Sequence, residues 1–120
     1  NFAGGEKESE EIYRDLMHKR IKFPALHKGD CNYVAVKSKN RALFAPLRQY
    51  EDQIMIPVIN FSTNEANSTL DIREIGMNAE KTYRFTELYT GQSFEAQKCE
   101  ELPAVMGPYE YRLWLIEVCD

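Results

Sequence analysis

The sequence predicts an all-β fold, an antiparallel β-sandwich of the Greek-key type with about seven strands, preceded by one N-terminal α-helix. Three observations support this prediction. Only the start of the chain has the three-to-four-residue spacing of apolar side chains that an amphipathic helix requires. After Pro24, apolar residues recur at every second position, as in half-buried strands. Polar or glycine-containing turns interrupt these runs about every eight to twelve residues, which is typical of a sandwich.

The predicted helix covers residues 6–20. Its apolar stripe contains Ile12, Leu16 and Met17, and this stripe must be buried against another part of the protein. Glutamates crowd the first turns and basic residues crowd the end, a distribution that complements the helix dipole. Pro24 is expected to end the helix, because proline disfavours a helical conformation in the residue before it. We therefore expect two parts, residues 1–23 with the helix and residues 24–120 with the sandwich.

The remaining elements are short strands. We expect them over residues 32–37, 42–50, 54–61, 70–75, 83–89 and 109–118, with a polar loop over residues 62–68. The run 54–61 is apolar on both alternating faces, as in a central strand that is covered on both sides. Pro57 lies within this run and cannot donate a hydrogen bond, so a bulge or an unpaired flank is expected there. Gly91 is expected to take a positive φ in a hairpin turn.

Composition and charge argue against several classes of function. The chain has 120 residues, 43% hydrophobic and 28% charged, which suits one globular domain. Its net charge of −4 argues against a nucleic-acid partner, which would require a basic face. No apolar run approaches the roughly 20 residues of a membrane span. The three cysteines and two histidines are too scattered for a disulfide framework or a metal site, so we expect no metal and no other cofactor.

No catalytic residue is expected in this chain. Its 19 acidic residues fall in polar turns, in the first helical turns or at alternating strand positions, where solvent exposure is the usual state. A catalytic carboxylate pair needs a pocket that shifts pKa values, and nothing in the sequence indicates one. The sequence also lacks a nucleophile elbow and a phosphate-binding glycine loop.

Aromatic residues are the candidates for ligand binding, and they make up 12% of the chain. Sugar-binding surfaces use flat aromatic faces beside polar groups, because the apolar face of a pyranose stacks on an aromatic ring. The candidates are Tyr50, Tyr89, Tyr109 and Trp114. The alternative is that these rings fill the core or an interdomain contact. The alternation within residues 109–118 places apolar side chains on both strand faces, which favours this alternative for Trp114.

Three stretches of the chain together resemble the α-amylase family of glycoside hydrolases. Residues 11–30, with the motif FPALHKGD, are similar to the last barrel helix of that family and its exit into the C-terminal domain. Residues 54–62, ending in VINFS, resemble a hydrophobic strand of that domain. The motif LYTGQ at residues 88–92, followed by residues 102–117, is similar to the end of the domain.

The resemblance implies that the chain is a non-catalytic C-terminal domain, called domain C, of an enzyme that acts on α-glucans. Residues 1–23 would then be the last helix of the catalytic barrel, and the barrel of the same polypeptide would cover Ile12, Leu16 and Met17. The resemblance also implies a retaining mechanism, whose aspartate and glutamate residues would lie in the barrel and not in this chain. Because the barrel would precede this chain, no localisation is predicted.

Two roles remain open at this point, and an independent hydrolase is the least favoured third. The leading role is structural, in which the domain packs against the barrel and stabilises it. The alternative is an auxiliary module that binds starch or maltodextrin. We also expect self-association through the barrel-facing surface when the barrel is missing, because such a loss leaves an apolar patch exposed.

Overall fold

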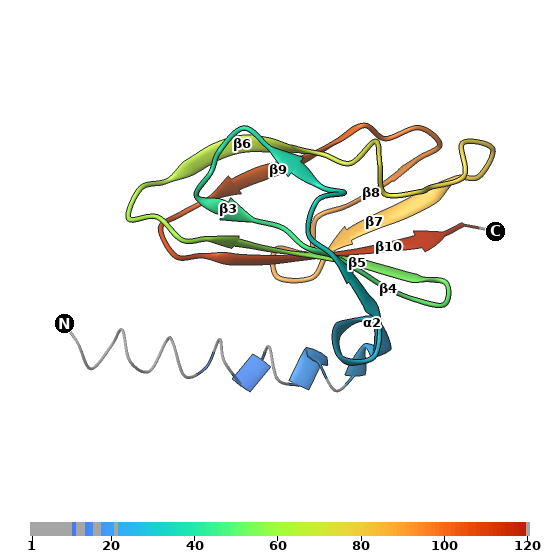
Figure 1. Ribbon diagram of the computed structural model, residues 1–120, viewed down its shortest axis with the longest axis horizontal. Coiled ribbons are helices and arrows are strands. Elements are labelled where there is room, and N and C mark those ends of the chain that lie inside the picture. The colour runs from blue at the N-terminus through green and yellow to red at the C-terminus, as the bar shows by residue number, and fades with distance from the viewer. Residues whose placement is uncertain (1–10, 12–13, 16–17, 21, 120) are drawn as a thin grey trace.

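The computed structural model describes residues 11, 14–15, 18–20 and 22–119. Two antiparallel sheets pack face to face, with a hydrophobic core between them (Figure 1). The larger sheet has seven strands in the order β1-β4-β5-β10-β7-β8, with β3 paired to β5. The smaller sheet has three strands in the order β2-β6-β9. The prediction of an all-β sandwich is confirmed.

The elements follow one another along the chain with short connections. One short helix and ten strands are described: α2 (Pro24–His27), β1 (Asp30–Asn32), β2 (Lys37–Ser38), β3 (Leu43–Phe44), β4 (Leu47–Tyr50), β5 (Gln53–Asn60), β6 (Ala66–Asp71), β7 (Tyr83–Glu87), β8 (Ser93–Ala96), β9 (Glu101–Met106) and β10 (Tyr111–Val118). The described residues before Phe23 are helical, in agreement with the predicted first helix. No helix within the described part of the chain is long and apolar enough to cross a membrane.

The chain enters the sandwich through a break at Phe23. The backbone of Phe23 is extended, with φ −107° and ψ 109°, as expected for a residue before proline. Pro24 then begins α2, at a helix position where the missing N–H removes no intrahelical bond. The predicted end of the first helix is therefore confirmed, whereas α2 was not predicted. A Cβ at Gly29 would lie 2.2 Å from the carbonyl oxygen of Gln49, so only glycine allows β1 to approach β4 this closely.

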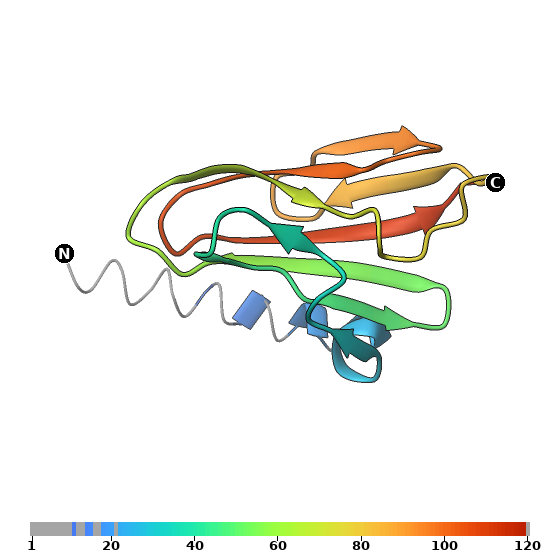
Figure 2. The same ribbon diagram turned by 45° about the horizontal axis from the view of Figure 1, so that its top comes forward.

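Strands β5 and β10 form the centre of the larger sheet (Figure 2). Pro57 of β5 lies opposite Leu113 of β10. On the other flank of β5, the pairing with β4 ends at Met55 and the pairing with β3 begins at Ile59. Pro57 therefore lies where one flank of β5 has no partner strand, which confirms the predicted unpaired flank. The positive φ of 77° at Gly91, in the turn between β7 and β8, is confirmed as well.

Several strand boundaries differ from the prediction. The predicted strand over residues 70–75 and the polar loop over residues 62–68 are wrong in position, because β6 covers Ala66–Asp71. Ala66 and Leu70 of β6 are buried, but the residues between them are polar, which hides the strand in the sequence. The predicted single strand over residues 32–37 is wrong, because residues 33–36 form a bend that separates β1 from β2. Strands β8 and β9 were not predicted; β9 contains Pro103 and lies at the edge of the smaller sheet, where proline is tolerated.

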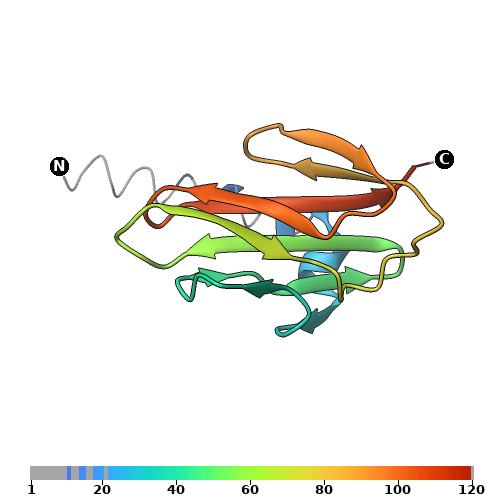
Figure 3. The same ribbon diagram turned by 90° about the horizontal axis from the view of Figure 1, so that it is seen from above.

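The two faces of the larger sheet have different neighbours. Its inner face packs on the smaller sheet, and Ile56, Val58, Trp114 and Ile116 belong to that core. Its outer face carries Met55 and Leu113, which are buried together with Ala25 of α2. Seen from the side of β6 and β9, α2 lies behind the larger sheet (Figure 3). The larger sheet is thus apolar on both faces, and among the described residues another sheet covers only its inner face.

Candidate functional site

The outer face of the larger sheet is the first candidate interaction surface. Its centre is the buried group of Ala25, Met55 and Leu113. Around this centre lie partly buried apolar and aromatic side chains: Phe23, Leu26, Tyr50, Leu88, Tyr89, Tyr111 and Leu115. We refer to these ten residues together as the outer face.

Side chains from β4 and β5 hold α2 on the outer face. The guanidinium of Arg48 donates from Nε to the carbonyl of Ala25 and from Nη2 to the carbonyl of Leu26, both at 3.1 Å. At the start of α2, the N–H of Ala25 donates to Oε1 of Gln53 at 3.0 Å. These are backbone groups that a short helix leaves without intrahelical partners. The sandwich therefore fixes the position and direction of the segment that enters it.

Helical residues ahead of α2 also contact the outer face. Asp15 and Lys19 form an ion pair one helical turn apart, and Nζ of Lys19 lies 4.3 Å from the ring centroid of Tyr89. The ring of Tyr89 in turn meets Tyr111 edge-on, with centroids 5.4 Å apart. These contacts place the helical segment against the end of β7 and the start of β10.

The hydroxyl of Tyr89 is buried and has no hydrogen-bond partner within the described residues. Burial is the main cause that raises its pKa, and the interaction with the neighbouring Asp15 carboxylate adds to the shift. Burial also raises the pKa of Tyr111 to about 12. A buried hydroxyl without a partner costs free energy, so this part of the outer face is suited to receive a polar group from outside the described residues.

The four aromatic candidates from the sequence are not brought together. Tyr50 and Tyr89 are partly buried on the outer face. Trp114 is only 1% exposed and lies in the core, where it meets Phe94 edge-on at 5.9 Å, so its ring offers no face to a ligand. Tyr109 is 61% exposed in the turn before β10, where its φ is 55°. The expectation that Trp114 fills the core is confirmed.

The apolar helix stripe of Ile12, Leu16 and Met17 lies outside the described residues. Its role in docking therefore stays a prediction. The division of the chain into residues 1–23 and 24–120 also stays a prediction, although the break at Phe23 is compatible with it.

A second surface is a row of three exposed aromatic rings, Tyr33, Phe44 and Phe61, which we call the aromatic strip. Their exposed fractions are 66%, 40% and 62%. The ring centroids of Tyr33 and Phe44 are 5.9 Å apart with planes inclined by 25°, and those of Phe44 and Phe61 are 6.3 Å apart with planes inclined by 49°. The turn with Tyr109 adjoins the strip, because the N–H of Tyr109 donates to the carbonyl of Ser62 at 3.3 Å.

The sequence pattern alone did not indicate the aromatic strip. Its three rings come from the bend after β1, from β3 and from the end of β5. Strand pairing brings them together, since Phe44 lies opposite Ile59 in the β3–β5 ladder. The only signal in the sequence was the odd-numbered position of Phe61, which continues the outward-facing alternation of β5.

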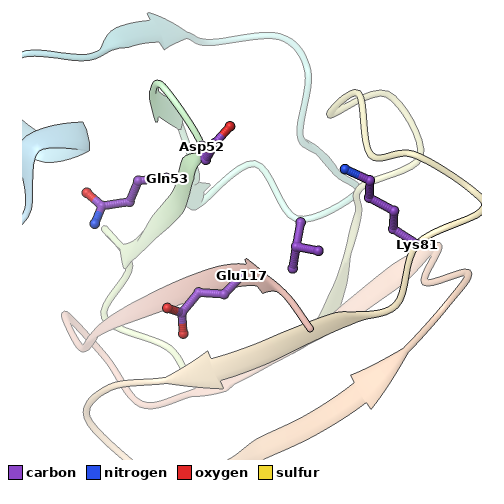
Figure 4. Close-up of a pocket in the computed structure, with 5 residues that line it drawn as sticks. Asp52, Gln53, Lys81 and Glu117 are labelled. Atoms are coloured by element: carbon purple, nitrogen blue, oxygen red, sulfur yellow. The ribbon is translucent and has the colours of Figure 1, made fainter. Parts of the chain in front are cut away.

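A depression at the other end of β5 brings no catalytic group together. It is lined by Asp52, Gln53, Lys81, Glu117 and Val118 (Figure 4). The carboxylates of Asp52 and Glu117 come from different elements and point away from each other, whereas an acid–base pair must converge on one substrate bond (Figure 4). Within the described residues, no group of three or more histidine, cysteine, aspartate or glutamate side chains is placed to hold a metal ion.

Comparison with known proteins gives a family and a set of similar folds. The model of the family described as maltogenic amylase, C-terminal domain, matches residues 33–113. A crystal structure of a variant of AmyP in complex with maltotriose is similar with a TM-score of 0.72 and 20% identity, over 95% of this chain and 22% of that chain. An α-amylase from Anoxybacillus is similar with a TM-score of 0.59 and 18% identity, over 84% of this chain and 20% of that chain.

A more distant fold neighbour is a β-L-arabinopyranosidase from Geobacillus stearothermophilus, with a TM-score of 0.54 and 11% identity, over 71% of this chain and 20% of that chain. No curated protein matches the sequence. The chain thus spans only 20% to 22% of the length of these solved structures. At these identities the structural likeness shows the fold alone. The assignment to a family rests on the match to the family model.

Proposed function

Because the chain belongs to the family of maltogenic amylase C-terminal domains, a family of non-catalytic domains, we propose that it packs its outer face against a catalytic barrel and stabilises it. The proposed whole protein is an α-amylase-type glycoside hydrolase that acts on α-glucans. The solved structures of AmyP, which hold maltotriose and maltose, support this choice of substrate class.

The observation that carries the proposal is the incomplete cover of the outer face. A sheet that is apolar on both faces needs a layer on each side. The smaller sheet provides one layer, but within the described residues only α2 and the helical segment before it lie on the other side. Tyr111 and Leu115 remain partly exposed there, and the Tyr89 hydroxyl remains without a partner. A further layer of protein on this face would supply both the apolar contacts and the missing hydrogen bond.

The attachment of α2 also supports a barrel on the side of the outer face. Arg48 and Gln53 hold α2 on the outer face and thereby set the direction in which the preceding helix leaves the sandwich. If that helix is the last helix of the barrel, chain continuity places the barrel on the same side. In the absence of the barrel, we expect the outer face to cause self-association of the chain.

The test compares two surface substitutions in the full-length protein encoded by the gene. Leu115→Glu places a charge on the outer face, and Val105→Glu places the same charge on the exposed side of β9 in the smaller sheet. We expect Leu115→Glu to lower the unfolding temperature of the barrel by about 5 °C or more, because it buries an unpaired charge. Val105→Glu should leave it unchanged.

Leu115 is partly buried within the chain itself. The effects of Leu115→Glu and Val105→Glu on the unfolding temperature are therefore also measured in the 120-residue chain alone. A loss that is larger in the full-length protein than in the chain alone reports the contact with the barrel. Equal losses in both, or an upstream coding sequence without barrel strands, would show that the proposal is wrong.

A further inference from the structure

We propose that Tyr109 is an anchor residue that the sandwich presents to the catalytic barrel, and that the aromatic strip beside it belongs to the same contact. The partner is the barrel of the proposed function, so this inference rests on that function. Tyr109 gives the barrel a second point of contact, at the far end of β5 from the attachment of α2.

The backbone of Tyr109 has a conformation that tyrosine rarely adopts. Its φ of 55° lies in the left-handed region, where the Cβ crowds the backbone and where glycine and asparagine are the usual residues. Such a conformation persists only where the surrounding structure enforces it, and it occurs preferentially at functional sites. The ring is 61% exposed. Burial within the chain therefore does not account for a tyrosine at this position.

Two turns hold Tyr109 in this conformation. Its N–H donates to the carbonyl of Ser62 at 3.3 Å, and the N–H of Asn60 donates to the carbonyl of Glu110 at 3.0 Å. Nδ2 of Asn60 donates to the carbonyl of Gly107, and the N–H of Gly107 donates to Oε1 of Glu110. The turn is thus fixed before a partner binds, so docking orders little additional backbone. A tyrosine on a fixed turn is suited to anchor an interface, since tyrosine is enriched among the residues that dominate binding.

The register of the larger sheet places the aromatic strip on the same side as the outer face. Phe44 lies opposite Ile59 in the β3–β5 ladder, and Tyr111 lies opposite Ile59 in the β5–β10 ladder. Residues directly opposite each other in antiparallel strands project from the same face of the sheet. Met55, four residues before Ile59, shares this face and is buried there with Ala25 of α2. The aromatic strip therefore continues the outer face.

Tyr109 lies at the edge of this continued face. Ser62, which accepts its N–H, directly follows Phe61 of the strip, and Tyr111 of the outer face lies two residues later. Figures 1 and 2 show the β9–β10 turn beside the β5–β6 turn, away from α2. Gln53 at the first residue of β5 holds α2, so the eight residues of the strand separate the two contacts by about 25 Å. Two contacts this far apart define the tilt of the barrel on the sandwich better than one.

The first experiment uses the opposite effects that a strained anchor predicts. Tyr109→Asn relieves the backbone strain, because asparagine tolerates a positive φ, and it removes the ring. In the 120-residue chain the unfolding temperature should stay unchanged or rise. In the full-length protein the unfolding temperature of the barrel should fall by about 3 °C or more, because an anchor contact is lost.

Glu51 provides the matched control for strain. Its φ is 53°, and it is exposed in the turn between β4 and β5, at the other end of β5. Glu51→Asn relieves strain in the same way without removing an aromatic ring. It should lower neither the unfolding temperature of the chain nor that of the full-length protein.

A photo-crosslink identifies the partner directly. In the full-length protein, benzoylphenylalanine in place of Tyr109 should link, on irradiation, to a barrel peptide of the same molecule. The same group in place of Val105 is the control, because Val105 is 62% exposed on the smaller sheet and faces away from the core. It should give no link to the barrel.

The role of Tyr109 is wrong if Tyr109→Asn lowers the unfolding temperature of the 120-residue chain or leaves that of the full-length protein unchanged. It is also wrong if the link from position 109 joins two copies of the protein or reaches no barrel peptide. If Leu115→Glu still destabilises the barrel in any of these cases, the proposed function stands and only the second contact is lost. If neither Leu115→Glu nor Tyr109→Asn affects the barrel, the proposed function fails as well.

Discussion

The buried carboxylate of Glu87 accepts a hydrogen bond from the backbone N–H of Leu113 at 2.6 Å, which joins β7 to the centre of β10. Its other oxygen accepts the N–H groups of Tyr89 at 3.0 Å and Thr90 at 2.7 Å. Glu87 is only 2% exposed. One acidic side chain therefore ties two strands together and also caps the turn that leads to β8.

We predict that Glu87→Ala lowers the free energy of unfolding by about 3–5 kcal/mol, because it leaves three backbone N–H groups without their acceptor. Glu87→Gln keeps one acceptor oxygen, so its free energy of unfolding should lie between those of the unchanged chain and of Glu87→Ala. Urea unfolding measures the change. The matched control is Glu95→Ala, which breaks an exposed ion pair with Arg84 and should cost less than about 1 kcal/mol. A loss at Glu87→Ala no larger than that of the control would contradict the role of Glu87.

A second buried polar residue, Asn60, connects two turns. Its Nδ2 donates to the carbonyls of Asn64 and Gly107, both at 2.9 Å, and its Oδ1 accepts the N–H of Ser62. We predict that Asn60→Ala costs about 2–3 kcal/mol of unfolding free energy. Asn60→Asp should cost at least as much, because its carboxylate would face two carbonyl oxygens.

Guanidinium unfolding checks the Asn60 variants, with Asn67→Ala on the exposed side of β6 as the control. The free energy of unfolding of that control should stay within about 0.5 kcal/mol of the value for the unchanged chain. If Asn60→Asp were as stable as the unchanged chain, the two donated hydrogen bonds would not contribute as we infer.

The anchoring of α2 can be tested at Arg48. Arg48→Ala removes both hydrogen bonds to the carbonyls of α2, and we expect α2 to open more often. Amide hydrogen exchange at Lys28, whose N–H donates to Pro24 at 2.8 Å, should become at least about tenfold faster. Arg84→Ala, on the exposed side of β7, is the control. Unchanged exchange at Lys28 would show that Gln53 and apolar packing hold α2 without Arg48.

The raised pKa of Tyr111 predicts a loss of stability at high pH. An unfolded tyrosine ionises near pH 10, whereas burial raises the pKa of Tyr111 to about 12 in the folded chain. Between these values the folded state holds a proton that the unfolded state has lost, so the free energy of unfolding falls as pH rises. Tyr89 contributes in the same direction, because its pKa is raised too.

The measurement is urea unfolding from pH 8 to above pH 11. Tyr111→Phe should make the decline with pH shallower, and Tyr109→Phe at an exposed ring is the matched control. An identical decline in the Tyr111→Phe variant would show that Tyr111 does not cause it.

Local rules in the sequence account for a large part of the fold. The extended backbone at Phe23 follows from the steric effect of Pro24. The central place of β5 follows from its apolar residues on both faces, and the unpaired flank beside Pro57 follows from the missing N–H. The two faces of β10 follow from the two-residue alternation that puts Trp114 in the core. Each of these rules acts between residues that are close in sequence.

The sequence by itself therefore determined the fold class, the end of the first helix, the central strand and the family resemblance, because periodicity and turn chemistry are local. Only the tertiary structure decided which distant residues meet. The contacts of Glu87 with Leu113 and of Arg48 with α2 depend on strand register and on the side that α2 covers. Likewise, the rings of Tyr33 and Phe61 share one surface only because Phe44 on β3 lies between them. No periodicity within one segment encodes such a meeting, since it arises from the packing of several strands at once.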